Sequence, residues 1–351
     1  MSYSLKQDLD HVLQHTSEVW EALRNQRIFL TGGTGFVGTW LVESLVRANE
    51  RLDLNASAVL LTRNREGFRR KAPHLAKHPS ISFVEGDALS FEFPEGEFPF
   101  VIHGATEQHA SATAQDPTGT FERDVMGTRH TLEFARTHGA TRFLFTSSGA
   151  IYGRQPSEME RIPEEYAGGP ETVDPNSAYG QAKRASEFMC AMYGRQFGYA
   201  AVIARLFVFS GPYLPLDLNF AIGNFVRDAL SGGPIKIGGD GTPYRSYLYA
   251  ADMAIWLWTL LIKGEPARPY NVGSGEGLTI AELAHAVAEH TRPGTKVEIA
   301  REPVSGVPAA RYVPSVERAR QELGLEALIP LSEQIRRMYA WHRALGSSGS
   351  S

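Results

Sequence analysis

The sequence predicts an α/β fold with a doubly wound parallel sheet and a smaller C-terminal lobe, and three observations lead to this prediction. Short apolar strands alternate with amphipathic helices from Arg27 to about Gly211. The first strand runs through a glycine-rich turn, "TGGTGFVG", directly into a helix. Beyond Gly211 the alternation stops, and loops rich in proline and glycine separate shorter elements. With right-handed crossovers, the alternating part gives a Rossmann-type sheet.

The first 26 residues predict an amphipathic helix ahead of this sheet. Apolar side chains recur there at helical spacing, at Leu9, Val12, Leu13, Val19 and Leu23. The segment begins with polar residues and contains no continuous apolar run, so we do not expect a secretory leader.

The elements that follow are predicted from short apolar runs and helical periodicity. We expect strands at 28–30, 56–64, 81–89, 98–106, 141–153 and 199–212, with helices at 36–47, 120–139 and 177–197. The run from Met253 to Ile262 is about half as long as a bilayer span, so we expect a buried helix there. Helical patterns at 278–290 and 315–325 close the chain.

Composition limits the classes of function. The chain has 351 residues, 42% of them hydrophobic and 21% charged, with a net charge of −4, which is ordinary for a globular protein. This charge offers no basic face for nucleic acid or an anionic membrane, so we expect neither as a partner. The single cysteine, Cys190, excludes an intramolecular disulfide and favours a cytoplasmic protein. No grouping of side chains predicts a metal site.

The glycine-rich turn predicts a dinucleotide site. Gly32, Gly35 and Gly38 form a G-x-x-G-x-x-G pattern between a strand and a helix. Glycine permits the tight turn and lets a pyrophosphate approach the backbone, while the helix N-terminus supplies N–H groups to the phosphates. The alternative is a tight turn without a ligand. We expect the cofactor to contact Gly32, Thr34, Gly35, Phe36, Val37 and Gly38.

The end of the second strand bears on which dinucleotide binds. An acidic residue there would accept hydrogen bonds from the ribose and favour NAD, but this strand ends in Thr62 and Arg63. Arg63, helped by Arg65 or Arg69, is suited to pair with a 2′-phosphate, which favours NADP over NAD. The alternative is that these arginines form a solvated surface.

Residues after the third and fourth strands complete the predicted cofactor site. Asp87 and Ala88 follow the third strand and are expected to contact the adenine, although Asp87 is equally suited to a turn. Ala105 follows the fourth strand, at the edge of the sheet where such folds bind ligands.

"SAYGQAKRASE" predicts an acid–base pair. Tyr179 and Lys183 are four residues apart, which puts both on one face of a helix. A nearby ammonium ion and an oxidised nicotinamide would lower the pKa of the tyrosine enough for it to take a proton from a sugar hydroxyl. Ser148, on the preceding strand, would hydrogen-bond the reacting oxygen. Alone, a Tyr-x-x-x-Lys spacing is also common on helix surfaces.

The motifs "TGGTGFVG", "VIHGAT", "DVMGT", "TSSGAIYG" and "YGQAK" occur in an order that resembles the extended short-chain dehydrogenase/reductase family, and more narrowly its nucleotide-sugar epimerase/dehydratase branch. The resemblance covers roughly residues 27–325. It implies a catalytic triad of Ser148, Tyr179 and Lys183, NADP or NAD along the glycine loop, a nucleotide-diphosphate sugar as substrate, and a homodimer formed through two helices.

The resemblance also implies substrate contacts. Arg245, in "GGDGTPYRSYLYAAD", would clamp the diphosphate, with Asn224 and Arg311 as further candidates; a surface salt bridge is the alternative role for Arg311. Four more residues lie at the sugar end of the predicted site, in the loop after the fourth strand and next to Ser148: Thr106, Glu107, His109 and Ser147. His109 has a purely structural hydrogen bond as its alternative.

With these contacts the domain prediction is complete. We expect an N-terminal helix at 1–26 and a NAD(P)-binding domain at 27–210, to which segment 243–273 returns. A substrate-binding lobe follows in two pieces, 211–242 and 274–345, and a flexible tail at 346–351.

Three departures from the family pattern narrow the reaction. Asp124 replaces the usual asparagine, and Val208 stands where many members carry asparagine. Gly149 and Ala150 occupy the positions at which 4,6-dehydratases carry two carboxyl groups for proton transfer. Elimination is therefore disfavoured unless Glu107 substitutes, and decarboxylation is weakened because related decarboxylases carry glutamate at the Ala150 position. A nucleotide-sugar 4-epimerase is favoured, with an NADPH-dependent 4-keto-sugar reductase as the alternative and a non-catalytic dinucleotide sensor as the last.

Overall fold

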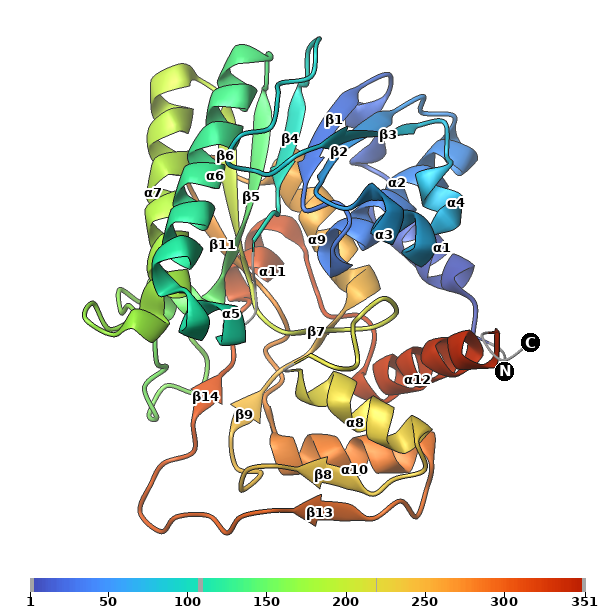
Figure 1. The fold of residues 1–351 in the computed structure, drawn as a ribbon, viewed down its shortest axis with the longest axis vertical. Coiled ribbons are helices and arrows are strands. Elements are labelled where there is room, and N and C mark those ends of the chain that lie inside the picture. Colours follow the sequence, from blue (N-terminus) through green and yellow to red (C-terminus); the bar gives the residue numbers. More distant parts are fainter. Residues whose placement is uncertain (1–2, 107–109, 219, 349–351) are drawn as a thin grey trace.

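The computed structural model describes residues 3–106, 110–218 and 220–348, and its centre is one parallel sheet. The strand order is β11-β6-β5-β4-β1-β2-β3, as Figure 1 shows. The strands are β1 (Arg27–Thr31), β2 (Ser57–Thr62), β3 (Ile81–Glu85), β4 (Phe100–His103), β5 (Arg142–Ser148), β6 (Ala200–Leu206) and β11 (Pro269–Val272). The order reverses between β1 and β4, which brings their carboxyl ends together at a switch point. The predicted doubly wound α/β fold is confirmed.

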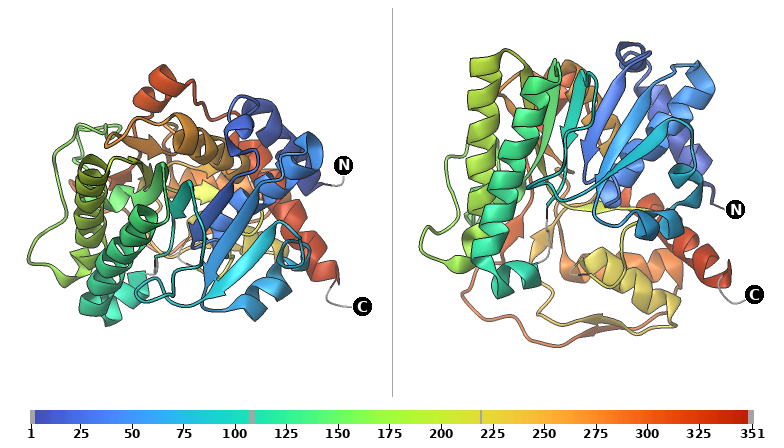
Figure 2. Two further views of the ribbon diagram at one scale, coloured as in Figure 1. Left: turned by 90° about the horizontal axis from the view of Figure 1, so that it is seen from above. Right: turned by 45° about the horizontal axis from the view of Figure 1, so that its top comes forward.

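Helices cover both faces of the sheet (Figure 2). The helices beside the sheet are α1 (Leu5–His15), α2 (Phe36–Leu52), α3 (Arg65–Lys71), α4 (Pro73–Ala76), α5 (Ala110–Gln115), α6 (Pro117–Thr137), α7 (Ala178–Phe197), α9 (Ala250–Lys263) and α11 (Glu317–Leu323). One core packs α1, α2 and α9 around four fully buried tryptophans, Trp20, Trp40, Trp256 and Trp258. The other core packs α6 and α7 around phenylalanines of the sheet.

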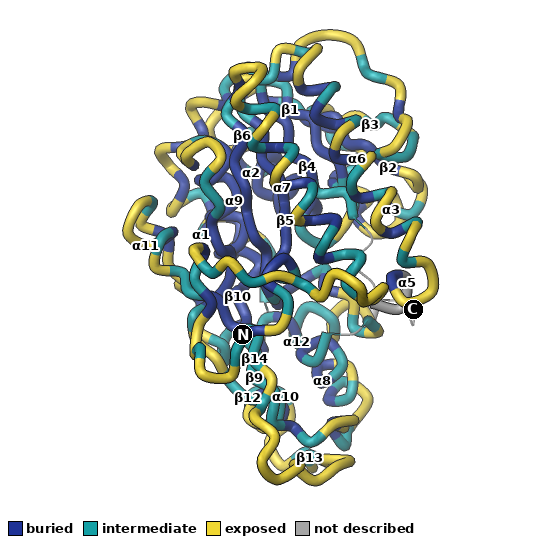
Figure 3. The backbone as a smooth tube through the Cα atoms, turned by 90° about the vertical axis from the view of Figure 1, so that its left-hand side faces the viewer, coloured by how far each residue is buried: buried dark blue, intermediate teal, exposed yellow. Residues whose placement is uncertain are grey.

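α9 is the most deeply buried helix of the described chain. Every residue from Ala250 to Leu261 is buried, which Figure 3 shows as a continuous dark segment. The sequence predicted a buried helix in this apolar run. No helix within the described residues is long and apolar enough to cross a membrane.

The C-terminal lobe lies below the carboxyl ends of the sheet strands (Figure 1). Its helices are α8 (Ala221–Leu230), α10 (Ile280–Thr291) and α12 (Leu331–Ser348). Its strands are β7 (Phe209–Ser210), β8 (Ile235–Ile237), β9 (Tyr244–Arg245), β10 (Leu248–Tyr249), β12 (Leu278–Thr279), β13 (Val297–Ile299) and β14 (Arg311–Tyr312). β12, β9 and β14 form a three-stranded sheet. Of segment 243–273, β9 therefore belongs to a lobe sheet, while β11 lies beside β6.

The N-terminal segment is shorter as a helix than the sequence predicted. α1 ends at His15, because the backbone N–H of Thr16 bonds the Leu13 carbonyl and its hydroxyl bonds the Val12 carbonyl. A short 3-10 turn, Trp20–Leu23, follows. On α1, the buried carboxylate of Asp8 accepts hydrogen bonds from Tyr3 and Tyr249 and pairs with Arg337 of α12.

Candidate active site

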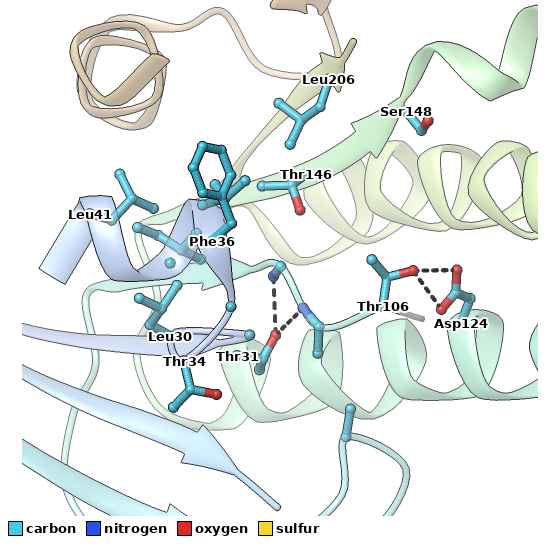
Figure 4. Close-up of a pocket in the computed structure, with 18 of the residues that line it drawn as sticks. Leu30, Thr31, Thr34, Phe36, Leu41, Thr106, Asp124, Thr146, Ser148 and Leu206 are labelled. Carbon is cyan, nitrogen blue, oxygen red and sulfur yellow. Dashed lines mark hydrogen bonds between the residues drawn. The ribbon is translucent and has the colours of Figure 1, made fainter. Parts of the chain in front are cut away.

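A cavity of about 560 Å³ lies at the carboxyl ends of the sheet strands, between the Rossmann part and the lobe. Figure 4 shows part of its lining. Most of the predicted cofactor and catalytic residues line it: Gly32, Thr34, Gly35, Phe36, Val37, Gly38, Thr62, Arg63, Asp87, Ala88, Ala105, Thr106, Ser147, Ser148 and Tyr179. Lys183, Asn224, Arg245 and Arg311 are not among its described lining residues. Glu107 and His109 lie outside the described residues.

The glycine loop is packed so closely that side chains are excluded at two positions. A Cβ on Gly32, which has a φ of +73°, would lie 2.4 Å from the carbonyl oxygen of Gly104. A Cβ on Gly38 would lie 2.4 Å from the Gly32 oxygen. A Cβ on Gly35 would meet only the Gly32 oxygen, at 3.3 Å, within this loop.

The geometry of this loop fits the diphosphate of a dinucleotide. α2 begins at Phe36, immediately after the loop, so its first-turn N–H groups point toward the cavity without intrahelical acceptors. Gly35 and the start of α2 line the cavity. A Cβ on Gly35 would meet no side chain within 4 Å, so the backbone of the loop is open to a ligand there. The residues present therefore meet the requirements of a dinucleotide site.

A buried network fixes the loop after β4 against the glycine loop. Thr31 Oγ1 accepts hydrogen bonds from the backbone N–H groups of Gly104 and Ala105, both at 3.1 Å (Figure 4). The same hydroxyl lies 2.7 Å from His103 Nδ1, and Thr128 contacts the other ring nitrogen at 3.1 Å. Burial lowers the pKa of His103 to about 3, so this imidazole is neutral and structural.

Lys71 supports the glycine loop from α3, a role that the sequence pattern did not reveal. Its ammonium donates to the carbonyl oxygens of Thr34 and Gly35, at 3.2 and 3.3 Å, and to Thr39 Oγ1 at 3.0 Å. Burial lowers the pKa of Lys71 to about 8. Its distance along the chain from the loop hid this contact from a motif-based reading.

Arg63 lines the cavity at the end of β2, but its neighbours differ from those expected. Its guanidinium lies 3.6 Å from the Asp87 carboxylate, and 62% of its side chain is exposed. Arg65 stacks over the Phe83 ring, 5.1 Å from its centroid, and Arg69 pairs with Glu66. Arg65 therefore has its partner on β3 and Arg69 has its partner on α3.

Ser148 and Tyr179 meet at the far end of the cavity, because β5 ends beside the first turn of α7. Ser148, and Thr106 from the loop after β4, lie close enough to the Tyr179 phenol to lower its pKa. The protein's own groups raise the pKa of Tyr179, through burial first and then the charge of Asp124, although Ser148 and Thr106 oppose this. The lowered tyrosine pKa expected from the sequence is therefore not produced by the chain alone.

The Lys183 ammonium contacts a backbone carbonyl and lies near Asp124. It donates to the Thr146 carbonyl at 3.3 Å, lies 3.8 Å from Asp124 Oδ2, and is 5.7 Å from the centroid of the Tyr179 ring. Burial lowers the pKa of Lys183 and the Asp124 charge opposes that shift.

Asp124, the first departure from the family pattern, links these groups. The two oxygens of its carboxylate share the hydroxyl proton of Thr106, at 3.0 and 2.9 Å from Oγ1 (Figure 4), and the carboxylate faces Lys183. An aspartate here adds a negative charge behind the tyrosine, which an asparagine would not.

At Gly149, neighbouring side chains fill the space that a side chain would need. A Cβ there would lie 2.6 Å from the Tyr312 hydroxyl and 2.7 Å from the Phe207 ring. Tyr312 belongs to β14 of the lobe and lines the cavity. The sequence analysis did not single out Tyr312, because pairing between distant segments brings it to the end of β5: β14 pairs with β9, and Val313 bonds Gln155 and Ile162.

The hydroxyl of Ser147 is hydrogen-bonded to a residue of α7. It donates to Glu187 of α7 at 2.5 Å, and Arg205 of β6 pairs with the same carboxylate at 2.8 Å. Arg205 also donates to Tyr152, whose hydroxyl donates to Asn271 of β11. Ser147 therefore lines the cavity while its hydroxyl has a partner on α7, and its predicted contact with substrate stays a prediction.

Of the predicted diphosphate residues, Arg245 and Arg311 lie on the paired strands β9 and β14, whereas Asn224 lies on α8. Arg245 donates to the Tyr244 carbonyl at 2.7 Å and lies 5.9 Å from the Tyr312 ring centroid. Arg311 stacks on the Tyr244 ring at 4.0 Å, and Asn224 accepts a hydrogen bond from Arg227 on α8. The Arg245 guanidinium thus lies over the ring of Tyr312, which lines the cavity.

Comparison with known proteins relates this geometry to a family. The model of the NAD dependent epimerase/dehydratase family matches residues 28–273. UDP-glucuronic acid decarboxylase 6 of Arabidopsis thaliana is 29% identical over 309 residues, covering 88% of this chain and 86% of that protein.

Two solved structures share the fold. UDP-glucose 4-epimerase of Thermus thermophilus, in complex with NAD, has a TM-score of 0.74 at 27% identity and covers 91% of this chain and 99% of its own. DesIV of Streptomyces venezuelae, a dTDP-glucose 4,6-dehydratase with NAD and TYD bound, has a TM-score of 0.76 at 25% identity, with 92% and 98% covered. The resemblance noted in the sequence is thus confirmed: the chain belongs to the NAD dependent epimerase/dehydratase family of nucleotide-sugar enzymes.

Proposed function

We propose that the protein is a nucleotide-sugar 4-epimerase that acts at C4 of a nucleotide-diphosphate sugar. One observation carries the proposal. Ser148 and Tyr179 line the same cavity as the glycine loop, while the space that a side chain at position 149 would need is filled by Tyr312 and Phe207. Oxidation and reduction at C4 need only the first pair, whereas elimination needs carboxyl groups at positions 149 and 150.

The chain's own residues then divide the work at C4. Tyr179 takes the proton of the sugar hydroxyl and returns it at the end of the cycle. Ser148 donates a hydrogen bond to the reacting oxygen and keeps it beside Tyr179. A bound NAD or NADP supplies the acceptor and donor of hydride at the same carbon. Arg245, on β9, holds the diphosphate at the lobe side.

The epimerase outcome requires the sugar to present its other face before C4 is reduced again. The cavity lining includes the apolar residues Val208, Leu214, Pro215 and Leu218. Val208, the second departure from the family pattern, supplies no directional hydrogen bond that would hold one face of the sugar.

A second candidate, decarboxylation of a nucleotide-linked uronic acid, is favoured by a different observation. The chain is similar over 88% of its length to a UDP-glucuronic acid decarboxylase. Oxidation at C4 of such a sugar creates a 3-oxo acid, which loses CO₂ without the pair of carboxyl groups that dehydration needs.

One experiment separates the two reactions. The purified protein is incubated with NAD or NADP and with UDP-glucose, UDP-galactose or UDP-glucuronic acid, and the nucleotide sugars are resolved by chromatography and mass spectrometry. Interconversion of the two hexoses supports the epimerase. Loss of CO₂ from the uronic acid, without hexose interconversion, would replace it by the decarboxylase, and no turnover of any sugar would reject both.

We further propose that Arg63 tunes the cofactor toward NADP. β2 ends in Thr62 and Arg63, without a carboxylate of its own to accept the ribose hydroxyls. The Arg63–Asp87 pair is exposed and 3.6 Å long, so it contributes little stability and a 2′-phosphate can compete for the guanidinium.

We also propose that α6 and α7 form a homodimer interface. Both helices lie side by side at one edge of the molecule (Figure 1). They carry large exposed apolar side chains: Phe121 and Met126 on α6, and Phe188, Met192 and Phe197 on α7. Light scattering of the purified protein measures the oligomer directly.

A further inference from the structure

Lys71 places a positive charge against the backbone of the glycine loop. Much of its side chain is exposed, but its ammonium lies 3.2 and 3.3 Å from the carbonyl oxygens of Thr34 and Gly35. Its third contact is Thr39 Oγ1 at 3.0 Å, and that hydroxyl donates to the Gly35 carbonyl at 2.5 Å. The three protons of the ammonium therefore all go to neutral oxygen atoms of the loop and of the first turn of α2.

These contacts act on two peptides at the cofactor end of the cavity. In a trans peptide the N–H points away from the C=O. The carbonyl of Thr34 shares its peptide with the N–H of Gly35, which donates to the Gly32 carbonyl at 3.1 Å and closes the turn. The carbonyl of Gly35 shares its peptide with the N–H of Phe36, which lines the cavity and begins α2 without an acceptor in the helix. A cation at these carbonyls polarises both peptides and makes both N–H groups stronger donors.

The acidic groups around Lys71 have other partners. The carboxylate of Glu43 on α2 accepts a hydrogen bond from Tyr213 at 2.5 Å and lies 2.8 Å from Nε2 of His74 on α4. On α3 itself, the only acidic residue pairs with Arg69. From the lobe, the ring of Tyr213 lies with its centroid 5.5 Å from the ammonium. Within the part of the chain that the structure describes, no carboxylate forms an ion pair with Lys71.

We infer that Lys71 is a positioning residue for the cofactor: its ammonium polarises the peptides of the glycine loop, and a bound diphosphate supplies the negative charge that this cation lacks in the protein alone. The three protons of Lys71 stay on the protein, so Lys71 acts on the diphosphate through the loop. The inference rests on the part of the proposed function that precedes any chemistry on the sugar, the binding of NAD or NADP at this loop.

The charge of Lys71 makes cofactor binding depend on pH. Desolvation of the ammonium lowers the pKa of Lys71 to about 8 in the protein alone. A bound diphosphate favours the charged form and so raises that pKa. The protonated protein therefore binds the cofactor more tightly than the neutral form does. Affinity is highest below pH 8 and declines as the pH rises through 8, and binding takes up protons between the two pKa values.

Isothermal titration calorimetry with NAD, which carries no 2′-phosphate, measures both effects. If the diphosphate raises the pKa of Lys71 by about one unit, affinity at pH 9.5 is about sevenfold weaker than at pH 7. Titrations at pH 8.5 in buffers of different ionisation enthalpy then show an uptake of about half a proton. An affinity that does not change between pH 7 and pH 9.5 would overturn the inference.

Two substitutions at Lys71 separate its charge from its shape. Lys71→Met keeps the length of the stem without the charge, so we expect affinity at pH 7 to fall about tenfold and the proton uptake to vanish. Lys71→Arg keeps a positive charge at every pH used, so affinity should stay within about threefold at pH 7, again without proton uptake. Lys77→Met, which removes an exposed lysine at the end of α4, is the matched control and should behave like the unaltered protein.

The proton uptake distinguishes a role of the charge from a purely structural role. If Lys71→Met weakens binding but takes up as many protons as the unaltered protein, another group titrates and the inference fails. Lys71→Arg covers the case in which the methionine variant does not fold. Binding without proton uptake in Lys71→Arg supports the inference, and unchanged uptake in that variant overturns it.

None of these measurements needs turnover, so the inference and the proposed reaction can fail separately. If no sugar is turned over but the proton uptake disappears in Lys71→Arg, the proposed reaction fails and the inference stands. If sugars are turned over but the uptake is unchanged in Lys71→Arg, the inference fails and the proposed reaction stands. A protein that binds neither NAD nor NADP would reject both.

Discussion

The two ends of the cavity exclude side chains by different means. At the cofactor end, a Cβ on Gly38 would meet backbone atoms of Gly32 and Gly33 at 2.4 Å. At the sugar end, a Cβ on Gly149 would meet the side chains of Tyr312 and Phe207. Backbone in a parallel sheet and its turns has little freedom to yield, whereas side chains can be replaced. The first end is therefore fixed by the fold itself, and the second is set by which residues the lobe supplies.

The largest expected effect is a loss of catalysis at the sugar end of the cavity, with the cofactor end unchanged. Tyr179→Phe removes the group that moves the proton at C4, so kcat should fall by about a thousandfold. Cofactor affinity, measured by titration of the nicotinamide fluorescence, should stay close to that of the unaltered protein, because the phenolic hydroxyl lies beyond the glycine loop. If affinity and kcat fell in step, the role assigned to Tyr179 would be refuted.

The next effect breaks the cofactor end. Gly38→Ala drives a methyl group into the Gly32 carbonyl and displaces the loop, so cofactor affinity should fall about a hundredfold. Gly238→Ala is the matched control, since a Cβ there meets nothing within 4 Å. An affinity for Gly38→Ala equal to that of the control would show that the loop can yield.

Stability measurements on Gly149 test whether side chains close the sugar end of the cavity. Gly149→Ala should lower the free energy of unfolding by about 1–3 kcal/mol, because the new methyl group overlaps Tyr312 and Phe207. Urea denaturation measures this loss. In a Phe207→Leu, Tyr312→Phe background the same substitution should cost less. An unchanged cost there would mean that backbone, and not these side chains, closes the sugar end.

A smaller effect sharpens the description of the cofactor end. Arg63→Ala should weaken NADP binding about tenfold and leave NAD binding nearly unchanged, because only NADP carries the phosphate that pairs with the guanidinium. Isothermal titration with each cofactor measures both constants, and Arg65→Ala serves as the control for loss of a nearby charge that stacks on Phe83 instead. Equal losses for NADP and NAD would reject a 2′-phosphate contact.

The smallest effect concerns the charge behind the sugar end. Asp124 raises the pKa of Tyr179 and of Lys183, so Asp124→Asn should lower both. Activity needs Tyr179 able to ionise and Lys183 protonated, so both limbs of the kcat–pH profile should move to lower pH, by about half a unit. Asp116→Asn, at the start of the same helix, should leave the profile in place. A shift of the acidic limb to higher pH would contradict the predicted direction of the pKa change.

The features read from the sequence were those encoded by neighbouring residues. The parallel sheet followed from alternating periodicity, and the glycine loop from a pattern of a few residues between Gly32 and Gly38. Tyr179 and Lys183 share a helix, so their common face could be predicted. The direction of the Lys183 ammonium could not, because it depends on Asp124 from a different helix.

What the sequence did not reveal depends on pairing between distant segments. Tyr312 reaches the end of β5 because β14 pairs with β9 and Val313 bonds Gln155 and Ile162, and Lys71 reaches the glycine loop because α3 packs beside it. Ser147 carries the same functional group as Ser148, yet successive residues of a strand face opposite sides. Its hydroxyl therefore bonds Glu187 behind the sheet, a distinction that composition alone does not make.

The contact between α1 and α12 has a consequence for synthesis on the ribosome. Asp8 is buried and ion-paired with Arg337, which is translated 329 residues later. At about 5–20 residues per second, that interval lasts roughly 16–66 s. Until Arg337 emerges, burial of Asp8 would leave a charge without its cationic partner. The first helix of the chain should therefore dock among the last, and a ribosome-bound chain stopped before α12 should leave α1 open to proteolysis.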